Sequence, residues 1–321
     1  MSLVDDQKDG PFAVLIAGPT ASGKSALGLT LAARLGGEIV NADSMQVYED
    51  LSIVTARPPA EDETAFPHHL YGHVSGAEVY STGKWLAAAV RTITDIQARG
   101  RVPIVLGGTG LYFRALTQGF VEVPAIPPEI RSQVRSEVDR IGPVAAHKLL
   151  LDVDAGWAAQ VHENDPQRIA RGLEVFRATG RGLSSWHQDP VEPPLSLPML
   201  KFVLEPDRGW LRERIDRRFA AMVASGALDE VAELLGRGFS PSLPVMKALG
   251  VPELAQHLRG DMELEDAAAL ASIKSRQYAK RQSTWFRQQM IAWNSIIAQD
   301  LESQSANIFS FIDDSGLTDS L

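Results

Sequence analysis

Eight residues near the start of the chain have the types and spacing needed to hold a phosphorylated ligand. They match the pattern G-x-x-x-x-G-K-[ST] and are Gly18, Pro19, Thr20, Ala21, Ser22, Gly23, Lys24 and Ser25. Glycines let the backbone bend so that successive N–H groups point at phosphate oxygens, and a helix N-terminus adds its positive dipole end. Lys24 would place a charge on the terminal phosphate, and the Ser25 hydroxyl would ligate Mg²⁺. The pattern predicts a site for a ligand with two or more phosphates.

An acidic residue follows the next predicted strand, in the segment NADSMQVY at 41–48. At the carboxyl end of a parallel strand, Asp43 should face the same crevice as the phosphate-binding loop. A carboxylate there can accept a proton from an incoming nucleophile or hold Mg²⁺ through water. Capping of a helix or turn is the alternative role for an aspartate placed before a serine.

The apolar pattern supplies the elements that must position these residues. Four short apolar runs predict buried strands, at 12–17, 38–42, 102–108 and 200–206. Helical patterns lie between them, at 25–35 and 83–99, and each ends at glycine. Strands that alternate with helices predict an α/β fold, a P-loop NTPase-like parallel sheet with helices on both faces. Its ligands would bind beyond the carboxyl ends of the strands.

Two proline-rich segments, at 121–130 and 189–198, divide the chain. The pattern between them is helical, so we expect a mostly helical insertion domain at 125–195. The P-loop core domain, with its C-terminal helices, would then comprise residues 1–124 and 196–299. Residues 300–321 are acidic, and we expect them to form a mobile tail.

The composition is typical of a cytoplasmic globular protein. The 321 residues, of which 45 % are hydrophobic and 22 % charged, can bury a sizeable core. The absence of cysteine excludes a disulfide framework, thiolate metal sites and a cysteine nucleophile. No apolar run approaches the ~20 residues of a membrane span, and residues 1–10 lack the features of a signal peptide. We therefore expect no membrane association.

The net charge of −9 argues against a nucleic-acid partner until its distribution is considered. Residues 267–299 contain no acid but five bases, which are Lys274, Arg276, Lys280, Arg281 and Arg287. At helical spacing Arg276, Lys280 and Arg287 share one face, where they could contact backbone phosphates. A solvated charged face is the alternative interpretation of this stretch.

Five segments, in this order, resemble the bacterial tRNA dimethylallyltransferases. They are GPTASGKS, NADSMQVY, LGGTGLYFRAL at 106–116, NDPQRIARGLEVF at 164–176 and AKRQSTWFR at 279–287. The resemblance implies transfer of the dimethylallyl group of dimethylallyl diphosphate to the exocyclic N6 of adenine 37, next to the tRNA anticodon, with release of diphosphate. The loop would then hold a diphosphate rather than a nucleoside triphosphate.

The resemblance also implies roles for single residues. Asp43 would accept the N6 proton and Thr109 would form hydrogen bonds near the reacting groups. Lys24, Mg²⁺ at Ser25, Arg218 and Arg131 would stabilise the leaving diphosphate. Contacts to the tRNA anticodon stem-loop would come from Asp43, Ser44, Met45, Gln46, Asn164, Asp165, Pro166, Gln167, Arg168, Lys247, Arg276, Lys280, Arg281 and Arg287. The adenine must leave its stack to react, and we expect the enzyme to be a monomer.

Some of these residues have simpler interpretations. Arg218 falls on the edge of the buried stripe of a helix predicted at 208–224, where a charge needs a partner, and an ion pair with a nearby aspartate would serve. Arg131 could be a solvated helix charge, and Thr109 a turn residue. The histidines of PHHLYGHV at 67–74 favour a loop or packing role over metal binding.

Two segments depart from the family pattern. Val54-Thr-Ala-Arg57-Pro58 stands where members commonly have G-T-A-K-P, and Gly250-Val251 stands where they have Gly-Tyr. The second difference removes an aromatic side chain from a loop expected to contact tRNA. The proposed chemistry does not depend on it.

Three other functions share part of the pattern. A small-metabolite kinase has the same loop and sheet, but it has no need for a long acid-free basic helix. A prenyltransferase acting on free adenine nucleotides has the same catalytic residues, but no use for the basic stretch or the NDPQR segment. A pure nucleic-acid-binding module leaves the phosphate-binding loop unexplained.

Overall fold

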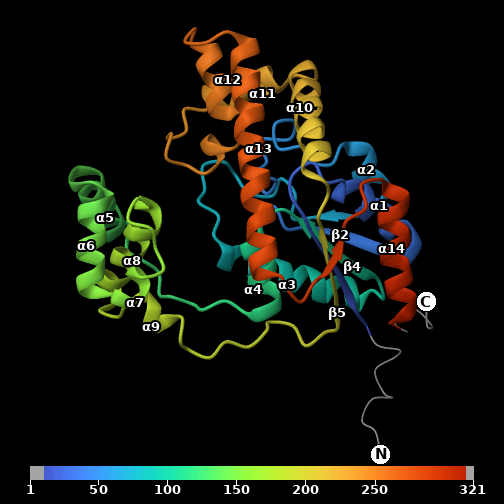
Figure 1. Cartoon of the computed structure of the whole chain (residues 1–321), viewed down its shortest axis with the longest axis horizontal. Coiled ribbons are helices and arrows are strands. Elements are labelled where there is room, and N and C mark those ends of the chain that lie inside the picture. Colours follow the sequence, from blue (N-terminus) through green and yellow to red (C-terminus); the bar gives the residue numbers. More distant parts are fainter. Residues whose placement is uncertain (1–10, 316–321) are drawn as a thin grey trace, which may run out of the picture. The chain divides into compact units, whose positions relative to one another are not determined.

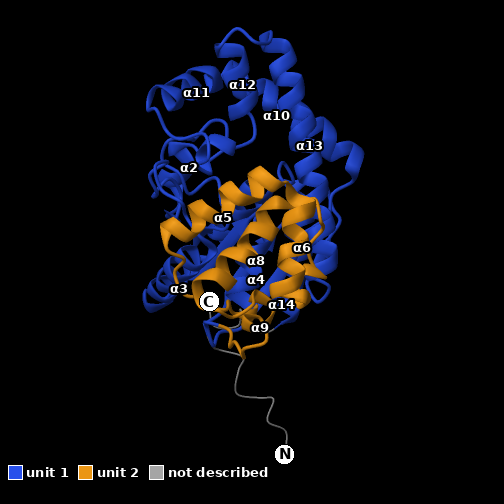
Figure 2. Ribbon diagram, turned by 90° about the vertical axis from the view of Figure 1, so that its left-hand side faces the viewer, with its two compact units in different colours: residues 1–117, 194–321 blue, residues 118–193 orange. Residues whose placement is uncertain are grey.

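The structure is a computed structural model, and it describes residues 11–315. The described residues divide into two compact units (Figure 2), one drawn from residues 1–117 and 194–321 and the other from residues 118–193. The helical insertion expected at 125–195 falls mostly in the second unit, which begins at residue 118.

A six-stranded, all-parallel sheet forms the core of the first unit (Figure 1), with strand order β3-β2-β4-β1-β5-β6. The strands are β1 (Ala13–Ala17), β2 (Gly37–Asn41), β3 (His68–His69), β4 (Val102–Gly107), β5 (Met199–Leu204) and β6 (Asn294–Ile296). The four predicted strands are confirmed, and three of them are buried throughout. Edge strands β3 and β6 were not predicted, since runs so short carry no readable alternation.

Helices cover both faces of this sheet, as the alternating pattern predicts. Leu15 of β1 packs in the same cluster as Trp85, whereas Ile16, the next residue, packs in the cluster that holds Leu27. The helices of this unit are α1 (Lys24–Leu35), α2 (Ala60–Ala65), α3 (Thr82–Ala98), α4 (Gly110–Gln118), α10 (Arg208–Ala224), α11 (Ala227–Gly236), α12 (Val251–Leu258), α13 (Leu264–Gln289) and α14 (Leu301–Asp314), with a 3₁₀ turn at Val245–Lys247. Among the described residues, none of the helices is long and apolar enough to cross a membrane.

The second unit is helical, and it has its own apolar core. Its helices are α5 (Pro128–Ile141), α6 (Pro143–Val153), α7 (Ala155–Ala158), α8 (Pro166–Thr179) and α9 (Leu183–Trp186). Val134, Leu150 and Ile169 are fully buried within it. The α/β sheet with a mostly helical insertion is therefore confirmed.

The mobile tail expected at 300–321 is wrong for the part that the structure describes. Asp300 caps α14 by accepting a hydrogen bond from the Ser303 N–H at 2.8 Å, and α14 lies beside α1 (Figure 1). Ile308 and Ile312, one turn apart, are fully buried against the sheet. The prediction weighed the acidic charges and overlooked this apolar stripe. Residues 316–321 lie outside the described residues.

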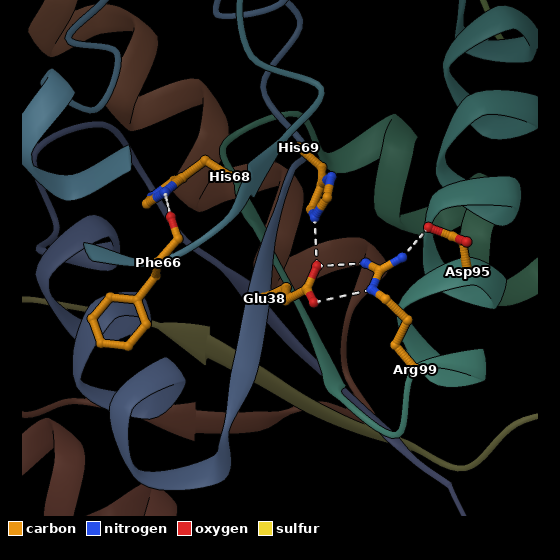
Figure 3. A network of polar contacts seen from close by, with 6 residues as sticks. All are labelled: Glu38, Phe66, His68, His69, Asp95 and Arg99. Atoms are coloured by element: carbon orange, nitrogen blue, oxygen red, sulfur yellow. Dashed lines mark hydrogen bonds and ion pairs between the residues drawn. The ribbon is translucent and has the colours of Figure 1, made fainter. Parts of the chain in front are cut away.

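A buried carboxylate stabilises the sheet at the amino ends of its strands. The phosphate-binding loop lies at the opposite, carboxyl ends. Glu38 of β2 is 5 % exposed, and it accepts hydrogen bonds from Arg99 at 2.7 Å and from His69 of β3 at 2.7 Å (Figure 3). Arg99 also pairs with Asp95 on its exposed side. Burial raises the pKa of Glu38, but the bonds from Arg99 and His69 outweigh burial and leave the pKa below its ordinary value. This contact explains the role of His69 without a metal.

Glu38→Gln should lower the free energy of unfolding by about 1–3 kcal/mol at pH 7, because a charged hydrogen-bonding partner is lost from a buried site. The folded-state pKa of Glu38 lies below the unfolded value, so its contribution is present above the unfolded pKa and is lost as pH falls through the folded pKa. Urea unfolding at pH 7 and at steps below pH 4.5 should show the variant and wild type converging. Asp95→Asn, on the exposed side of Arg99, is the control. An equal effect of both variants would contradict the assignment.

Candidate active site

The phosphate-binding loop joins β1 to α1, the context that its sequence pattern requires. Ala21 and Gly23 have φ angles of 64° and 98°, in the left-handed region. Gly23 adopts this conformation freely, whereas at Ala21 it costs about 1–3 kcal/mol. Such turns aim successive N–H groups at one point, and α1 adds its N-terminal dipole. The loop thus has the shape of an anion-binding concavity, and Ser25 is exposed at its end.

Lys24 lies folded against this loop. Its ammonium group donates to the Pro19 carbonyl at 2.7 Å and to the Ser22 hydroxyl at 3.4 Å. Burial lowers the pKa of Lys24 to about 7; the charge of Asp43 opposes this shift and that of Arg218 adds to it. Burial therefore disfavours the charge of the ammonium, and an arriving diphosphate would favour it again.

Asp43 follows β2 and is half-buried. Its Oδ1 accepts the Met45 N–H at 2.9 Å, and the Asp43 N–H donates to the Asn41 side chain at 2.8 Å. Oδ2 faces the loop after β4, where a Cβ placed on Gly108 would lie 3.2 Å from it. One carboxylate oxygen is thus fixed by backbone, and the other faces the neighbouring loop.

Thr109 follows β4 and lies against the Asp43 segment. Its hydroxyl accepts the Ser44 N–H at 2.9 Å and donates to the Ser44 hydroxyl at 3.2 Å. Its own N–H donates to the Ala42 carbonyl at 3.1 Å. A side chain at Gly107 would approach that carbonyl to 2.1 Å, so only glycine permits this contact. Because β2 and β4 are neighbours, the two loops meet, and Thr109 holds the residue next to Asp43.

Arg218 of α10 reaches the phosphate-binding loop from the side. Its guanidinium donates to the Thr20 hydroxyl, and Arg214, one turn earlier, donates to the Ala21 carbonyl at 3.0 Å. Burial lowers the pKa of Arg218 to about 10, which leaves it charged at neutral pH. Among the described residues its contact is this hydroxyl rather than an aspartate, so the alternative of a buried ion pair is not what the structure shows.

Gln282 of α13, which we did not single out from the sequence, joins the two loops. Its Oε1 accepts the Thr20 N–H at 2.9 Å, and its Nε2 donates to the Gly108 carbonyl at 2.8 Å. The buried residues of α13 follow a helical stripe that includes Ala271, Ser275 and Gln282. A glutamine on the buried stripe of a helix indicates a side chain that needs hydrogen-bond partners, and this signal was present in the sequence. From the sequence we considered only the positive charges of the exposed face.

A basic groove of about 380 Å³ lies between α10 and α13. Leu211, Ile215 and Ala279 are buried and form part of its lining. The cations that line it are Arg208 and Arg212 of α10 and Arg276, Lys280 and Arg287 of α13. The structure therefore brings together the three cations predicted to share a face, although Arg276 also pairs with Asp216. Arg281 lines a second groove on α13, beside Trp285, which shares Gln277 and Lys280 with the first.

The other residues expected to contact tRNA in the first unit differ in accessibility. Ser44, Met45 and Gln46 are half-buried. The Gln46 amide donates to the carbonyls of Thr55 and Ala56 at 2.9 and 2.8 Å, so its N–H groups are already engaged.

Lys247 is exposed on the 3₁₀ turn, whereas Val251, where the family aromatic would stand, is 1 % exposed at the start of α12. The Val251 side chain therefore belongs to the core and presents nothing at the surface.

The remaining candidates belong to the second unit. Arg131 lies on α5, and its Nε is buried without a hydrogen-bond partner in the described structure. The segment of Asn164, Asp165, Pro166, Gln167 and Arg168 forms the start of α8. Asp165 caps this helix by accepting the Arg168 N–H at 3.0 Å, and the Arg168 guanidinium lies 4.8 Å from the Trp157 ring centroid. Asp165 thus has a structural role whatever else the segment contacts.

An anion-binding loop next to a carboxylate, on a parallel sheet with a basic groove, defines an enzyme that acts on a phosphorylated substrate. Comparison with known proteins identifies its family. The family model described as IPP transferase matches residues 46–289, and the one described as isopentenyl transferase matches residues 12–67. This chain belongs to the IPP transferase family.

Relatives and solved structures agree with this assignment. A tRNA dimethylallyltransferase of Parvibaculum lavamentivorans is 54% identical over 95% of this chain and 97% of its own length. One from Rhodospirillum rubrum is 49% identical over 93% of each chain. The crystal structure of the full-length tRNA isopentenylpyrophosphate transferase from Bacillus halodurans matches with a TM-score of 0.69 and 34% identity over 96% of this chain and 97% of that one. A eukaryotic dimethylallyltransferase acting on tRNA matches with a TM-score of 0.80 and 29% identity, over 94% and 78% of the two chains.

Proposed function

We propose that this chain transfers the dimethylallyl group of dimethylallyl diphosphate to N6 of adenine 37, next to the tRNA anticodon, and releases diphosphate. The observation that carries the proposal is the meeting of three loops at one edge of the sheet. Gln282 joins the phosphate-binding loop to the loop that carries Thr109, and Thr109 in turn holds the loop of Asp43 through Ser44. The relatives from Parvibaculum lavamentivorans and Rhodospirillum rubrum are both named tRNA dimethylallyltransferase, which supports the same reaction.

In this reaction the C1–O bond of the donor breaks, and its electron pair leaves with the diphosphate. The N6 lone pair of adenine forms the new C–N bond, and the N6 proton passes to Asp43, whose Oδ2 is not held by backbone. Lys24, the loop N–H groups and Arg218 stabilise the charge that builds on the diphosphate. Thr109 keeps the Asp43 segment in place through Ser44. Arg131 is our proposal for a further contact to the diphosphate.

Mg²⁺ fits the residues of this site. The Ser25 hydroxyl is exposed at the start of α1, and Mg²⁺ commonly combines one or two protein oxygens with phosphate oxygens and water. When bound, the ion would neutralise charge on the leaving diphosphate. Ser25 would be its ligand. Among residues 11–315 there is no group of three or more acidic, histidine or cysteine side chains that would hold an ion without the substrate.

We propose that the tRNA anticodon stem-loop contacts Asp43 to Gln46, Lys247 and the basic residues of α13 in the first unit, and residues 164–168 in the second. The cations Arg276, Lys280 and Arg287 would face backbone phosphates. We also propose that the enzyme acts as a monomer in the cytoplasm.

Transfer of radiolabel from dimethylallyl diphosphate to unmodified tRNA tests this function, with AMP and ATP as alternative acceptors. We expect label in tRNA and none in AMP. Label in AMP would instead indicate an enzyme acting on free nucleotides. Turnover of ATP without prenyl transfer would indicate a kinase.

Removing two cations from the α10–α13 groove should weaken tRNA binding in a salt-dependent way. For Lys280→Ala/Arg287→Ala we expect the slope of log K against log[salt] to become less negative by about 1–2 units. Each lost phosphate contact removes about 0.9 from the magnitude of this slope. Filter binding at several salt concentrations measures it. Arg259→Ala, whose guanidinium pairs with Asp261 on the surface, is the control. An unchanged slope in the double variant would show that these cations are solvated charges.

A further inference from the structure

One buried side chain connects the two halves of the site. Gln282 is 6 % exposed, and its amide accepts from the Thr20 N–H and donates to the Gly108 carbonyl, at 2.9 and 2.8 Å. Gly108 fits closely against it, because a Cβ there would come within 2.3 Å of Nε2. On the same helix Trp285 covers Gly110, where a Cβ would lie 2.2 Å from the indole ring. The segment from the loop after β4 to the start of α4 therefore packs against α13 at two points, Gly108 and Gly110.

The two loops that Gln282 joins have different tasks in the proposed reaction. Thr20 belongs to the loop that would hold the leaving diphosphate, and its hydroxyl contacts Arg218. Gly108 directly precedes Thr109, which holds Ser44 beside the proton acceptor Asp43. A displacement of one loop against the other would change the distance between the leaving group and the base.

The chemistry of the contact calls for a primary amide. One bond needs an acceptor and the other a donor, and glutamine supplies both from one rigid group. A carboxylate at this position lacks the donor, and an alkyl chain lacks both. The Thr20 N–H is already engaged by Gln282 and the Ser22 N–H by the Pro19 carbonyl, so the phosphate would be bound by other N–H groups of the loop. Loss of Gln282 would therefore free the loop without removing a phosphate contact.

We propose that Gln282 is a positioning residue, which fixes the phosphate-binding loop relative to the loops of Asp43 and Thr109 for group transfer. The inference rests on the proposed function, since the two loops are assigned their tasks by it. It differs from a contact with tRNA, because the amide faces the protein interior.

Gln282→Leu tests the inference, and Gln304→Leu is a matched control. Gln304 is also a buried glutamine, at 1 % exposure. Its amide donates to the Ser22 carbonyl of the phosphate-binding loop and to the Ala298 carbonyl, so it does not join that loop to the loops of Asp43 and Thr109. For Gln282→Leu we expect kcat to fall about 100-fold, as small misplacements of reacting groups do, with the Kd for magnesium diphosphate within about threefold. For Gln304→Leu we expect any change to fall on that Kd, with kcat within about threefold. Gln282→Met, of similar length and uncharged, replaces the leucine variant if that variant does not fold.

A second readout does not depend on activity. In wild type, binding of inorganic diphosphate with Mg²⁺ should slow amide hydrogen exchange in residues 106–116 about threefold or more, because Gln282 links that segment to the filled loop. This protection should be lost in Gln282→Leu and kept in Gln304→Leu. The inference is overturned if both variants behave alike, or if Gln282→Leu keeps its kcat and its protection. If wild-type protein transfers no prenyl group, the proposed function fails, and the exchange experiment still decides whether Gln282 couples the loops.

Discussion

Asp43→Asn should reduce kcat for transfer to tRNA about 10²–10⁴-fold, the usual contribution of a general base. Asparagine has nearly the same size, and its carbonyl can still accept the Met45 N–H that holds Oδ1 in wild type. What it loses is the ability to take a proton through the other atom, which faces the loop after β4. Single-turnover transfer from dimethylallyl diphosphate to unmodified tRNA measures the effect without product release.

Binding measurements separate this loss from a folding or affinity defect. The Kd values for tRNA and for magnesium diphosphate should stay within about threefold of wild type, since uniform binding is not altered by the loss of a base. A variant that keeps more than about a tenth of the wild-type kcat would show that Asp43 is not the proton acceptor. The role would then be positional, through the turn that Asp43 forms with Met45.

Lys24→Met should lower kcat/KM for the donor about 10²–10³-fold, as loss of one charge-stabilising group does.

The buried ammonium also predicts a pH effect. The pKa of Lys24 is about 7 in the protein without ligand, because burial disfavours its charge. A bound diphosphate favours the charge and raises the pKa. Between pH 7 and the ordinary pKa of lysine, binding should therefore take up a proton, and the contribution of Lys24 to affinity should fall as pH rises.

Calorimetry of diphosphate binding at pH 8 in buffers of different ionisation enthalpy measures this uptake. Lys24→Arg is the control, since its guanidinium stays charged and takes up no proton, while the titration of diphosphate itself is common to both proteins. Wild type should take up more protons than Lys24→Arg. Equal uptake would mean that Lys24 is already fully charged before the anion arrives.

The parts of the site that follow from local sequence were predictable. The phosphate-binding loop is one continuous segment, and its glycines and flanking strand and helix specify the turn directly. Asp43 and Thr109 were placed correctly at strand ends, because parallel strands align their carboxyl ends. The helix at 208–224 was also predicted with a buried stripe, and the structure shows that stripe in the buried residues Leu211, Ile215, Phe219 and Met222.

Contacts between distant segments were not predictable in this way. In the sequence, the residues around Gln282 stand out for their positive charge, whereas Gln282 itself carries no signal of which groups it contacts. The carbonyl that its amide donates to lies 174 residues away in the chain, and the N–H that it accepts from lies 262 residues away. The short edge strands and α14 likewise depend on what they pack against. Ile308 and Ile312 order a segment that its acidic composition alone suggests is mobile.

The sequence by itself determined the chemistry that this protein carries and the type of sheet that positions it. A phosphate-binding loop, a carboxylate after the next strand and a run of bases are properties of residue type and spacing. The tertiary structure decided which groups are free to act. Burial lowers the pKa of Lys24. The Gln46 amide is engaged by a backbone carbonyl, and the Val251 side chain lies in the core. These outcomes depend on dielectric and on competition for hydrogen bonds, which arise only when segments far apart in the chain pack together.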